Sequence, residues 1–464
     1  MQKTLVILVV GLSPALVGQH TPNLLKLSRR GGLRPLTVGA PAVTCTSQST
    51  LVTGLTPAQH GIVANGWYFR DLSEVWLWRQ SNKLVGGEKI WEAGKARNPE
   101  FTCAKMFWWY NMYSSADWSA TPRPMYPADG RKIPDHYAYP PELHDELDKK
   151  FGQFPLFKFW GPGADITSSQ WIADATRHVM ETRYPTLTLT YLPHLDYNLQ
   201  RLGPDLDHPD IQNDLAQVDA LCGQLIDAAD SHGQRIIVVS EYGITPVSDA
   251  IHINRELRKA GLLKVRVEKT QEQLDAGASD AFAVADHQLA HVYVNNPQAF
   301  NKTREILEQL DGVEHVLGEE GKKAWGLNHQ RAGELVAISR ADRWFSYYYW
   351  LDDKRAPDYA RTVDIHRKPG YDPVELFVDP EIKMPMAAIA SRVARKKLGF
   401  RTLLDVISLK DTSLVKGSHG RPTDDPDHGP ILISSEADHL PSGAVHSKDF
   451  KALVLQHIFD PGVA

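Results

Sequence analysis

The 464-residue chain has little of several features that mark specialised classes of protein. Its three cysteines, Cys45, Cys103 and Cys222, are too few and too scattered for a disulfide framework, and none forms a Cys-x-x-Cys pair. We therefore expect a reducing, cytoplasmic setting. No run approaches the ~20 consecutive apolar residues of a membrane-spanning helix. The sequence therefore predicts no membrane span.

An excess of positive charge is also missing. Lys and Arg total 51 against 56 Asp and Glu, a formal charge of −5, so no nucleic-acid polymer is expected as a partner. Hydrophobic residues make up 42% and charged residues 23%, which are ordinary globular proportions and exclude disordered, collagen-like and coiled-coil chains. The chain is long enough to bury a large core.

Short apolar runs followed by polar loops recur along the chain. Residues 5–10 end at Gly11, residues 186–191 lead into a loop containing Asp196, and residues 235–240 lead into Glu241 and Tyr242. The first run is too short and too β-branched for a signal peptide, so we interpret it as a buried strand. Near-continuous apolar strands are typical of a sheet covered on both faces. We expect a ligand site where these strands end.

The sequence therefore predicts an α/β fold in which helices sandwich a mixed central sheet, as a single domain over residues 1–464. Most of the 12 tryptophans lie between Trp67 and Trp171, and we predict an aromatic-rich cap inserted at residues 66–165. The alternative is that these aromatics form an ordinary satellite core, because Trp is usually buried for its packing area. A second insertion or lid is predicted at residues 251–380.

The most informative segment is a pair of threonine-containing turns followed by an asparagine. Its residues are Pro41-Ala42-Val43-Thr44-Cys45-Thr46, then Leu51-Val52-Thr53-Gly54-Leu55-Thr56-Pro57-Ala58-Gln59-His60-Gly61-Ile62, and then Asn65. This pattern resembles the nucleotide pyrophosphatase and phosphodiesterase branch of the alkaline phosphatase superfamily. The resemblance implies that Thr44 attacks phosphorus from a helix N-terminus, where the helix dipole favours an oxyanion. It implies that Asn65 donates to a nonbridging phosphoryl oxygen.

Further matches follow in the order that the same family shows. Asp196 and Gln200 precede Gly203-Pro204, and the loop Gly417-Ser418-His419-Gly420 resembles one that supplies a histidine ligand. Residues 240–247 resemble a strand-end Ser-Asp-His-Gly-Met-Thr-Pro-Val motif, and agreement continues at residues 280–294 and 368–373. The resemblance spans essentially the whole chain and implies an alkaline-phosphatase-like core. His366 competes with His419 as a ligand, and we prefer His419 for its flanking glycines.

The departures from the family pattern concern the metal ligands. Members with two zinc ions have an Asp-Gly pair after the first strand, where this chain has Val10-Gly11. The family's Asp-His pair is Glu241-Tyr242, and the histidine after Asp196 is Gln200. The matching metal positions are therefore Asp196, Gln200, Glu241, Tyr242 and His419, of which Gln200 is a weak ligand and Tyr242 a poor one.

This donor set offers charge enough for one ion at most. Two carboxylates, a histidine and an amide oxygen suit Mn, Mg, Fe(II) or a loosely held Zn. We therefore predict one divalent metal ion or none. His287 is predicted to line the substrate pocket, although a satisfied core histidine and a metal ligand are alternatives. Its spacing to His291 superficially resembles a zinc helix but lacks the catalytic glutamate of that motif.

The resemblance implies a hydrolase-like phosphoryl-transfer enzyme that acts on a small organic phosphate or pyrophosphate ester through Thr44. One alternative is a non-hydrolytic binding or accessory protein for a phosphorylated or cyclitol-like metabolite in secondary metabolism. The substituted ligand set resembles a subgroup encoded in bacterial and algal ebo-type gene clusters. A third reading is a lyase or isomerase that uses Glu241 and Tyr242 as base and acid. The oligomeric state, the substrate, and mono- versus diesterase activity stay open.

Overall fold

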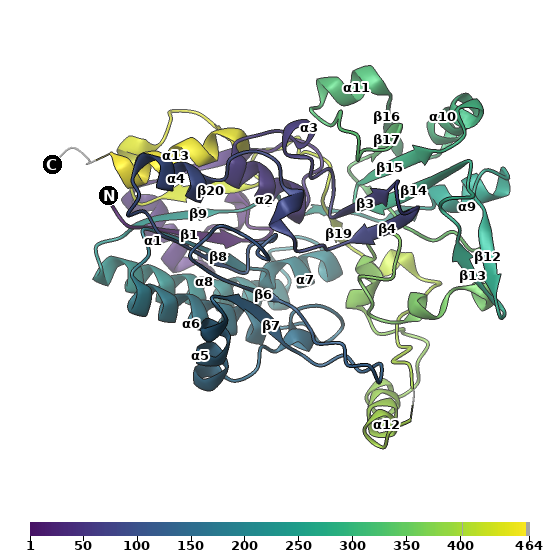
Figure 1. Cartoon of the computed structure of the whole chain (residues 1–464), viewed down its shortest axis with the longest axis horizontal. Helices are drawn as coiled ribbons and strands as arrows, with labels where there is room; N and C mark the ends of the chain where they lie inside the picture. Colours follow the sequence, from purple (N-terminus) through teal and green to yellow (C-terminus); the bar gives the residue numbers. More distant parts are fainter. Residues whose placement is uncertain (401, 461–464) are drawn as a thin grey trace.

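The computed structural model describes residues 1–400 and 402–460. A nine-stranded mixed sheet forms its centre, in the order β21-β2-β20-β9-β1-β8-β5-β6-β7 (Figure 1). The strands are β1 (Thr4–Val9), β2 (Gly32–Thr37), β5 (Cys103–Met106), β6 (Trp118–Pro122), β7 (His136–Tyr139), β8 (Leu187–Leu192), β9 (Arg235–Val239), β20 (Ile431–Ser434) and β21 (Val445–His446).

The three strands expected from their apolar runs lie side by side in the middle of this sheet. Strand β1 pairs in parallel with β8 on one side, from Thr4 opposite Leu187, and with β9 on the other, from Thr4 opposite Arg235. All three are buried along their length, because helices cover both faces. Their carboxyl ends therefore meet at one edge, which places the loops with Asp196 and Glu241 next to each other.

Two helical layers cover this sheet, which confirms the predicted fold class. One layer contains α1 (Pro22–Arg30), α6 (Ile166–Arg183), α7 (His194–Leu202) and α8 (Pro209–Ser231). The other contains α2 (Thr44–Thr53), α3 (Pro57–His60), α4 (Ile90–Arg97) and α13 (Phe450–Phe459), as Figure 1 shows. Among the described helices, none is long and apolar enough to cross a membrane.

A second sheet lies beyond the end of the central sheet where β1, β8 and β9 stop (Figure 1). It has the order β14-β15-β17-β16, and its elements are β14 (Ala281–Asp286), β15 (Leu289–Val294), β16 (Val313–Leu317), β17 (Leu335–Ser339), α9 (Ile253–Lys259), α10 (Phe300–Gln309) and α11 (Glu319–Ala324). Strands β14 and β15 form a hairpin in which Asp286 pairs with Leu289. The two-residue turn between them brings His287 to the end of the central sheet, with a left-handed φ of 61°.

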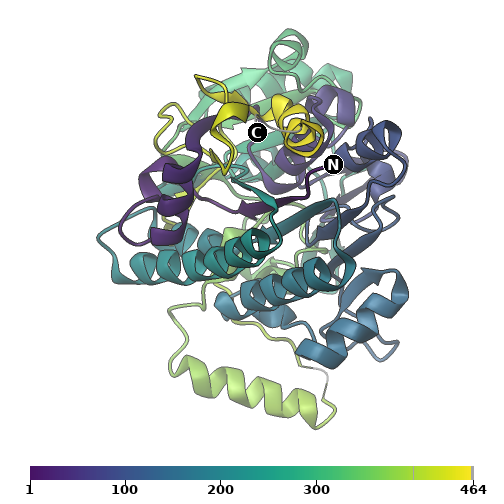
Figure 2. The same ribbon diagram turned by 90° about the vertical axis from the view of Figure 1, so that its left-hand side faces the viewer.

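Short elements complete the chain. Four two-stranded pairs are β3 (Gly66–Phe69) with β4 (Glu74–Leu77), β10 (Thr245–Pro246) with β19 (Gly417–Ser418), β11 (Asp249–Ile251) with β18 (Arg343–Phe345), and β12 (Val265–Glu268) with β13 (Gln271–Leu274). Helix α5 (Pro141–Phe151) packs on β7, and α12 (Pro385–Lys397) stands away from the body (Figure 2). The 3₁₀ helices are η1 (Pro14–Leu16), η2 (Asn82–Leu84), η3 (Leu156–Lys158), η4 (Pro297–Ala299), η5 (Asp353–Arg355), η6 (Asp358–Arg361), η7 (Pro373–Leu376), η8 (Thr412–Leu414), η9 (Ala437–His439) and η10 (Ser447–Asp449).

The tryptophan-rich segment contributes to both cores. Strands β5, β6 and β7, from the predicted cap at residues 66–165, extend the central sheet. Trp91 and Trp108 are fully buried in the main core, whereas Trp67 and Trp109 belong to the core of the second sheet. Trp78 lies 4.9 Å from Trp109 between ring centroids and links this segment to the end of the central sheet. The division into a cap at 66–165 and a lid at 251–380 stays a prediction.

Candidate active site

Thr44 is the first residue of α2, a helix that is buried over its whole length. The preceding residue, Val43, is extended, so the chain enters the helix from the loop that carries Pro41. The first backbone N–H groups of a helix have no partner within the helix, and the dipole adds partial positive charge there. The end of α2 that carries the Thr44 hydroxyl is therefore suited to an oxyanion.

Asn65 is fixed beside this helix end by three hydrogen bonds. Its Oδ1 accepts from the backbone N–H of Cys45 at 2.9 Å. Its backbone N–H donates to Asp286 Oδ2 at 2.7 Å, and its Nδ2 donates to Asp286 Oδ1 at 3.0 Å. The predicted pair Thr44 and Asn65 therefore does come together. Asp286 holds the amide in place, and burial raises the pKa of this carboxyl to about 6.

Asp286 belongs to the site but is not among the residues predicted from the sequence motifs. The one feature of the sequence that points to Asp286 is its position at the end of a strand, directly before His287. Only the hairpin geometry shows that this position meets Asn65, which lies 221 residues earlier in the chain. The sequence separation is too large for any local pattern to reveal the contact.

Tyr242 occupies the middle of the site. Its hydroxyl lies 3.3 Å from Thr44 Oγ1 and donates to Asp196 Oδ1, also at 3.3 Å. Its ring stacks on His419 with centroids 3.5 Å apart and an angle of 6° between the planes. Burial raises the pKa of Tyr242 well above its ordinary value, so the phenol is neutral. A neutral hydroxyl therefore bridges the threonine and the carboxylate.

Asp196 and Gln200 lie one turn apart on α7 and hydrogen-bond to each other. Gln200 Nε2 donates to Asp196 Oδ2 at 2.9 Å, while its Oε1 accepts from the Tyr371 hydroxyl at 3.1 Å. The amide oxygen that the resemblance offered to a metal is thus engaged by Tyr371. Burial raises the pKa of Asp196 to about 7, although the hydrogen bonds from Gln200 and Tyr242 oppose that rise.

Glu241 follows the central strand β9 and is fully buried. Neither carboxylate oxygen has a hydrogen-bond partner among the described residues. Burial raises the pKa of Glu241 to about 8, and the nearby Gln48, Thr44 and Tyr242 lower it only in part. A buried carboxyl without partners is costly in its ionised form, which makes Glu241 a candidate functional group.

His419 and His287 complete the cluster. His419 Nδ1 bonds the carbonyl oxygen of Ala42 at 2.8 Å, so its Nε2 carries the lone pair, and Nε2 has no partner within the described chain. His287 Nδ1 bonds Asp286 Oδ1 at 2.7 Å, and its ring stacks on Tyr371 at 3.6 Å. The two imidazoles are 3.7 Å apart between centroids, so the predicted His287 does reach the site. The rival ligand His366 is exposed.

Two groups in the site have free donor atoms. Glu241 has two unpartnered oxygens and His419 one unpartnered nitrogen, and Asp196 Oδ1 lies 3.9 Å from that nitrogen. Carboxylates and an imidazole are ligand types that a divalent ion uses. Among the described residues, however, Asp196, Glu241 and His419 do not bring three ligand atoms within 4.8 Å of one another.

Comparison with known proteins defines the family. Residues 4–372 match the type I phosphodiesterase / nucleotide pyrophosphatase family, so the chain belongs to that family. An uncharacterized pyrophosphatase/phosphodiesterase of Schizosaccharomyces pombe is 27% identical over 241 residues, which cover 49% of this chain and 42% of that protein. The chain thus aligns with about two fifths of the length of this curated relative.

Solved structures share the fold over almost the whole chain. Phosphonoacetate hydrolase from Sinorhizobium meliloti 1021, in complex with phosphonoacetate, has a TM-score of 0.62 at 15% identity, with 98% of this chain and 96% of that chain covered. Murine ectonucleotide pyrophosphatase/phosphodiesterase 5, inactive and in complex with AMP, has a TM-score of 0.59 at 16% identity, covering 99% and 95%. These structures share the fold of the chain, and the match over residues 4–372 confirms the predicted nucleotide pyrophosphatase/phosphodiesterase family.

Proposed function

We propose that this protein is a phosphoryl-transfer enzyme that hydrolyses a small organic phosphate or pyrophosphate ester, with Thr44 as the nucleophile. The observation that carries the proposal is the chain of hydroxyls from Thr44 through Tyr242 to Asp196. A threonine hydroxyl needs a base to attack phosphorus, and Asp196, with a pKa of about 7, is half ionised at neutral pH.

In the first step, Thr44 Oγ1 bonds to phosphorus while the bond from phosphorus to the leaving oxygen breaks. The Thr44 proton passes to the Tyr242 oxygen as the Tyr242 proton passes to Asp196. Both hydrogen bonds are longer than the usual 2.7–2.8 Å for O–H···O, so substrate binding must tighten them. In the second step, water attacks the phosphothreonine and its OH stays on phosphorus, while the bond from phosphorus to Thr44 Oγ1 breaks. Thr44 Oγ1 takes back its proton from Asp196 through Tyr242. The other water proton goes to solvent, which supplies the proton to the leaving oxygen of the first step.

Developing negative charge on the phosphoryl oxygens faces the first N–H groups of α2 and the Asn65 amide. Asp286 holds that amide in place through two hydrogen bonds. Glu241, with its pKa of about 8, is mostly protonated at pH 7 and does not repel an anionic substrate. A divalent ion would need Glu241, Asp196 and His419 to move closer together, and it would then add positive charge at the phosphoryl oxygens.

The experiment is a turnover assay with aryl phosphate mono- and diesters, with and without added Mn or Zn, followed by intact-mass detection of phosphorylated protein. We expect a transient phosphoryl adduct in the wild type and none in Thr44→Ala. The matched control is Thr46→Ala on the same helix, because the Thr46 hydroxyl has no hydrogen-bond partner among the described residues. Full turnover in Thr44→Ala would exclude the threonine mechanism.

A non-hydrolytic binding or accessory role in secondary metabolism is the second candidate, and the position of Tyr242 favours it. The tyrosine ring covers His419 and its hydroxyl engages both Thr44 and Asp196. Such a protein would hold a phosphorylated or cyclitol-like metabolite without cleaving it, in the cytoplasm. Assays in ¹⁸O-labelled water separate the two proposals, because label in released phosphate requires hydrolysis. A lyase or isomerase that uses Glu241 and Tyr242 would instead release product without that label.

A further inference from the structure

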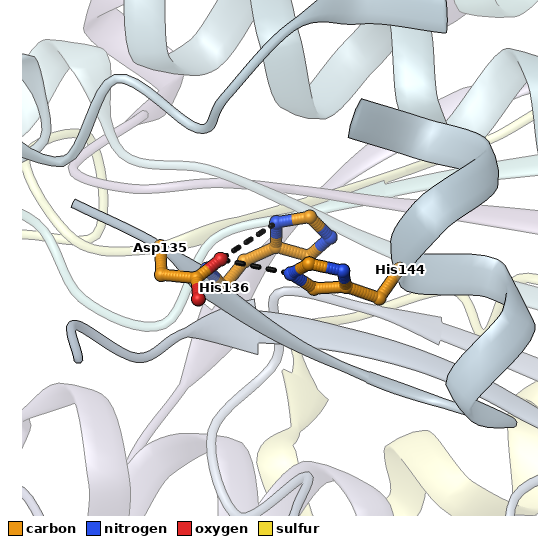
Figure 3. Close-up of side chains that lie close together, drawn as sticks. All are labelled: Asp135, His136 and His144. Carbon is orange, nitrogen blue, oxygen red and sulfur yellow. Dashed lines mark hydrogen bonds and ion pairs between the residues drawn. The ribbon is translucent and has the colours of Figure 1, made fainter. Parts of the chain in front are cut away.

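A second group of metal-ligating side chains lies at the far edge of the central sheet. Asp135 and His136 stand at the start of β7, the last strand of the sheet, and His144 and Asp148 lie one turn apart on α5. Figure 3 shows both imidazoles directed toward the Asp135 carboxylate. One ligand atom from each of Asp135, His136 and His144 lies within 4.8 Å of the other two.

His136 is the unusual member of this cluster. Its side chain has no exposed surface, and neither ring nitrogen has a hydrogen-bond partner within the described chain. Its Nδ1 faces Asp135 Oδ1 at 4.0 Å and Asp148 Oδ1 at 3.6 Å, and that Asp148 oxygen also lacks a partner. A buried imidazole that faces two carboxylates without bonding either is costly unless something lies between them.

His144 lies between two carboxylates. Its Nδ1 lies 3.2 Å from Asp145 Oδ1, and its Nε2 is hydrogen-bonded to Asp135 Oδ1 at 2.8 Å. Metal-bound histidines commonly donate the proton of the outer nitrogen to a carboxylate, and Asp145 stands at that outer position. An ion would therefore replace the proton shared between His144 Nε2 and Asp135.

Three of these groups are close enough to share one small ion. Bonds of about 2.0–2.2 Å to zinc place neighbouring tetrahedral ligand atoms about 3.3 Å apart. The ligand atoms of Asp135, His136 and His144 lie within 4.8 Å of one another, with His144 Nε2 at 2.8 Å and His136 Nδ1 at 4.0 Å from Asp135 Oδ1. Asp148 Oδ1 lies 3.6 Å from His136 Nδ1 but outside this group. Asp135 and His144 are part-exposed, so their side chains can adjust.

We propose that Asp135, His136 and His144, with Asp148 beside His136, form a binding site for one divalent transition-metal ion of the zinc type. Imidazoles and carboxylates are usual ligands for zinc and its first-row neighbours. The ion would join the edge strand β7 to α5 and would supply the missing partners of His136 and Asp148. This site is separate from the cluster around Tyr242 and does not depend on the proposed catalytic function.

The experiment uses the full chain, stripped with a chelator and then titrated with Co²⁺ as a spectroscopic probe and with Zn²⁺ in competition. We expect visible absorption typical of a tetrahedral Co²⁺ site in the wild type, lost on addition of Zn²⁺. His144→Gln and Asp135→Asn should each weaken binding at least tenfold. Both residues are part-exposed, so folding should survive either change, and circular dichroism checks this. His232→Gln removes an exposed histidine elsewhere and should bind like the wild type.

A double variant, Glu241→Gln with His419→Gln, separates this site from the catalytic cluster. The cobalt spectrum and zinc affinity of the β7–α5 site should persist in the double variant. The proposal is overturned if His144→Gln and Asp135→Asn keep the wild-type spectrum and affinity, or if the wild type binds neither metal at micromolar concentration. Loss of the signal only in the double variant would overturn it as well and would assign the metal to the catalytic cluster.

Discussion

The cluster around Tyr242 and the cluster at β7 and α5 both gather carboxylates and histidines, but they use them differently. Around Tyr242, Asp196 and Asp286 are already bonded by Gln200, Tyr242, Asn65 and His287. At β7 and α5, a buried histidine and a carboxylate face each other without bonding. Ligand types alone therefore do not separate the two clusters; which of their atoms already have partners does, and around Tyr242 only Glu241 and His419 keep unpartnered ligand atoms.

The two clusters also differ in how the chain assembles them. Residues of the first cluster range from Thr44 to His419, and seven separate segments supply it. The second lies within residues 135–148. Family resemblance indicated the first cluster because its motifs have a fixed order. It gave no hint of the second, where the two histidines match no recognised metal motif.

The largest expected effect is on Thr44. Thr44→Ala should lower kcat/KM for a phosphate ester by at least about 10³-fold, because the proposed nucleophile is lost. Thr44→Ser should retain a measurable part of the activity, since it keeps a hydroxyl. Steady-state kinetics on purified variants measure both effects, with melting curves to show that the fold persists. Equal activity of the Ala and Ser variants would contradict the role of the hydroxyl.

The next effect concerns Tyr242 and tests whether this side chain transfers a proton or blocks the site. Tyr242→Phe keeps the ring stacked on His419 but removes the proton path, so kcat should fall by about 10²-fold. Activity as a function of pH provides a second readout. The wild-type kcat/KM should rise as pH increases through about 7, where Asp196 ionises, and this limb should be absent in Tyr242→Phe. Activity that increases in Tyr242→Phe would show that the tyrosine blocks the site.

The third effect is on stability and tests the unpartnered Glu241. Its pKa of about 8 in the folded protein exceeds the ordinary value of 4.5, so the folded state holds this proton more tightly than the unfolded chain does. The proton on Glu241 therefore contributes fully to the free energy of unfolding below pH 4.5. This contribution is lost as the pH rises to about 8.

Glu241→Gln removes that loss and should stabilise the protein at pH 8 by a few kcal/mol, with little change at pH 4. Denaturant unfolding at the two pH values measures the difference. Gln200→Glu is the contrasting variant, because it adds a second buried carboxyl beside Asp196 and should destabilise more at high pH. A Glu241→Gln effect that is the same at both pH values would mean that the carboxyl is not protonated by burial.

The smallest expected effect is at β7 and α5. Saturating Zn²⁺ should raise the Tm of the wild type by a few degrees, because a ligand that binds only the folded chain stabilises it. In His144→Gln this rise should disappear, while the Tm without metal changes little. Differential scanning fluorimetry with and without Zn²⁺ checks this, and an equal rise in His144→Gln would place the ion elsewhere.

Much of the fold follows from the sequence. The buried runs at β1, β8 and β9 are long enough and apolar enough to specify central parallel strands, and the chain order of the motifs specified the family. No pattern in the sequence predicts that β5, β6 and β7 extend the same sheet, because the tryptophan-rich segment around them lacks a clean period.

Most residues of the candidate site were also predictable from the sequence, but the hydrogen bonds between them were not. Thr44, Asn65, Asp196, Glu241 and His419 were named from motif order, and the fold brings them together. That the Tyr242 hydroxyl stands between Thr44 and Asp196, that Gln200 turns its oxygen to Tyr371, and that Asp286 holds Asn65 depend on segments far apart in the chain. Short-range patterns determine elements and their buried faces; only tertiary packing determines which buried polar atoms find partners and which are left without one.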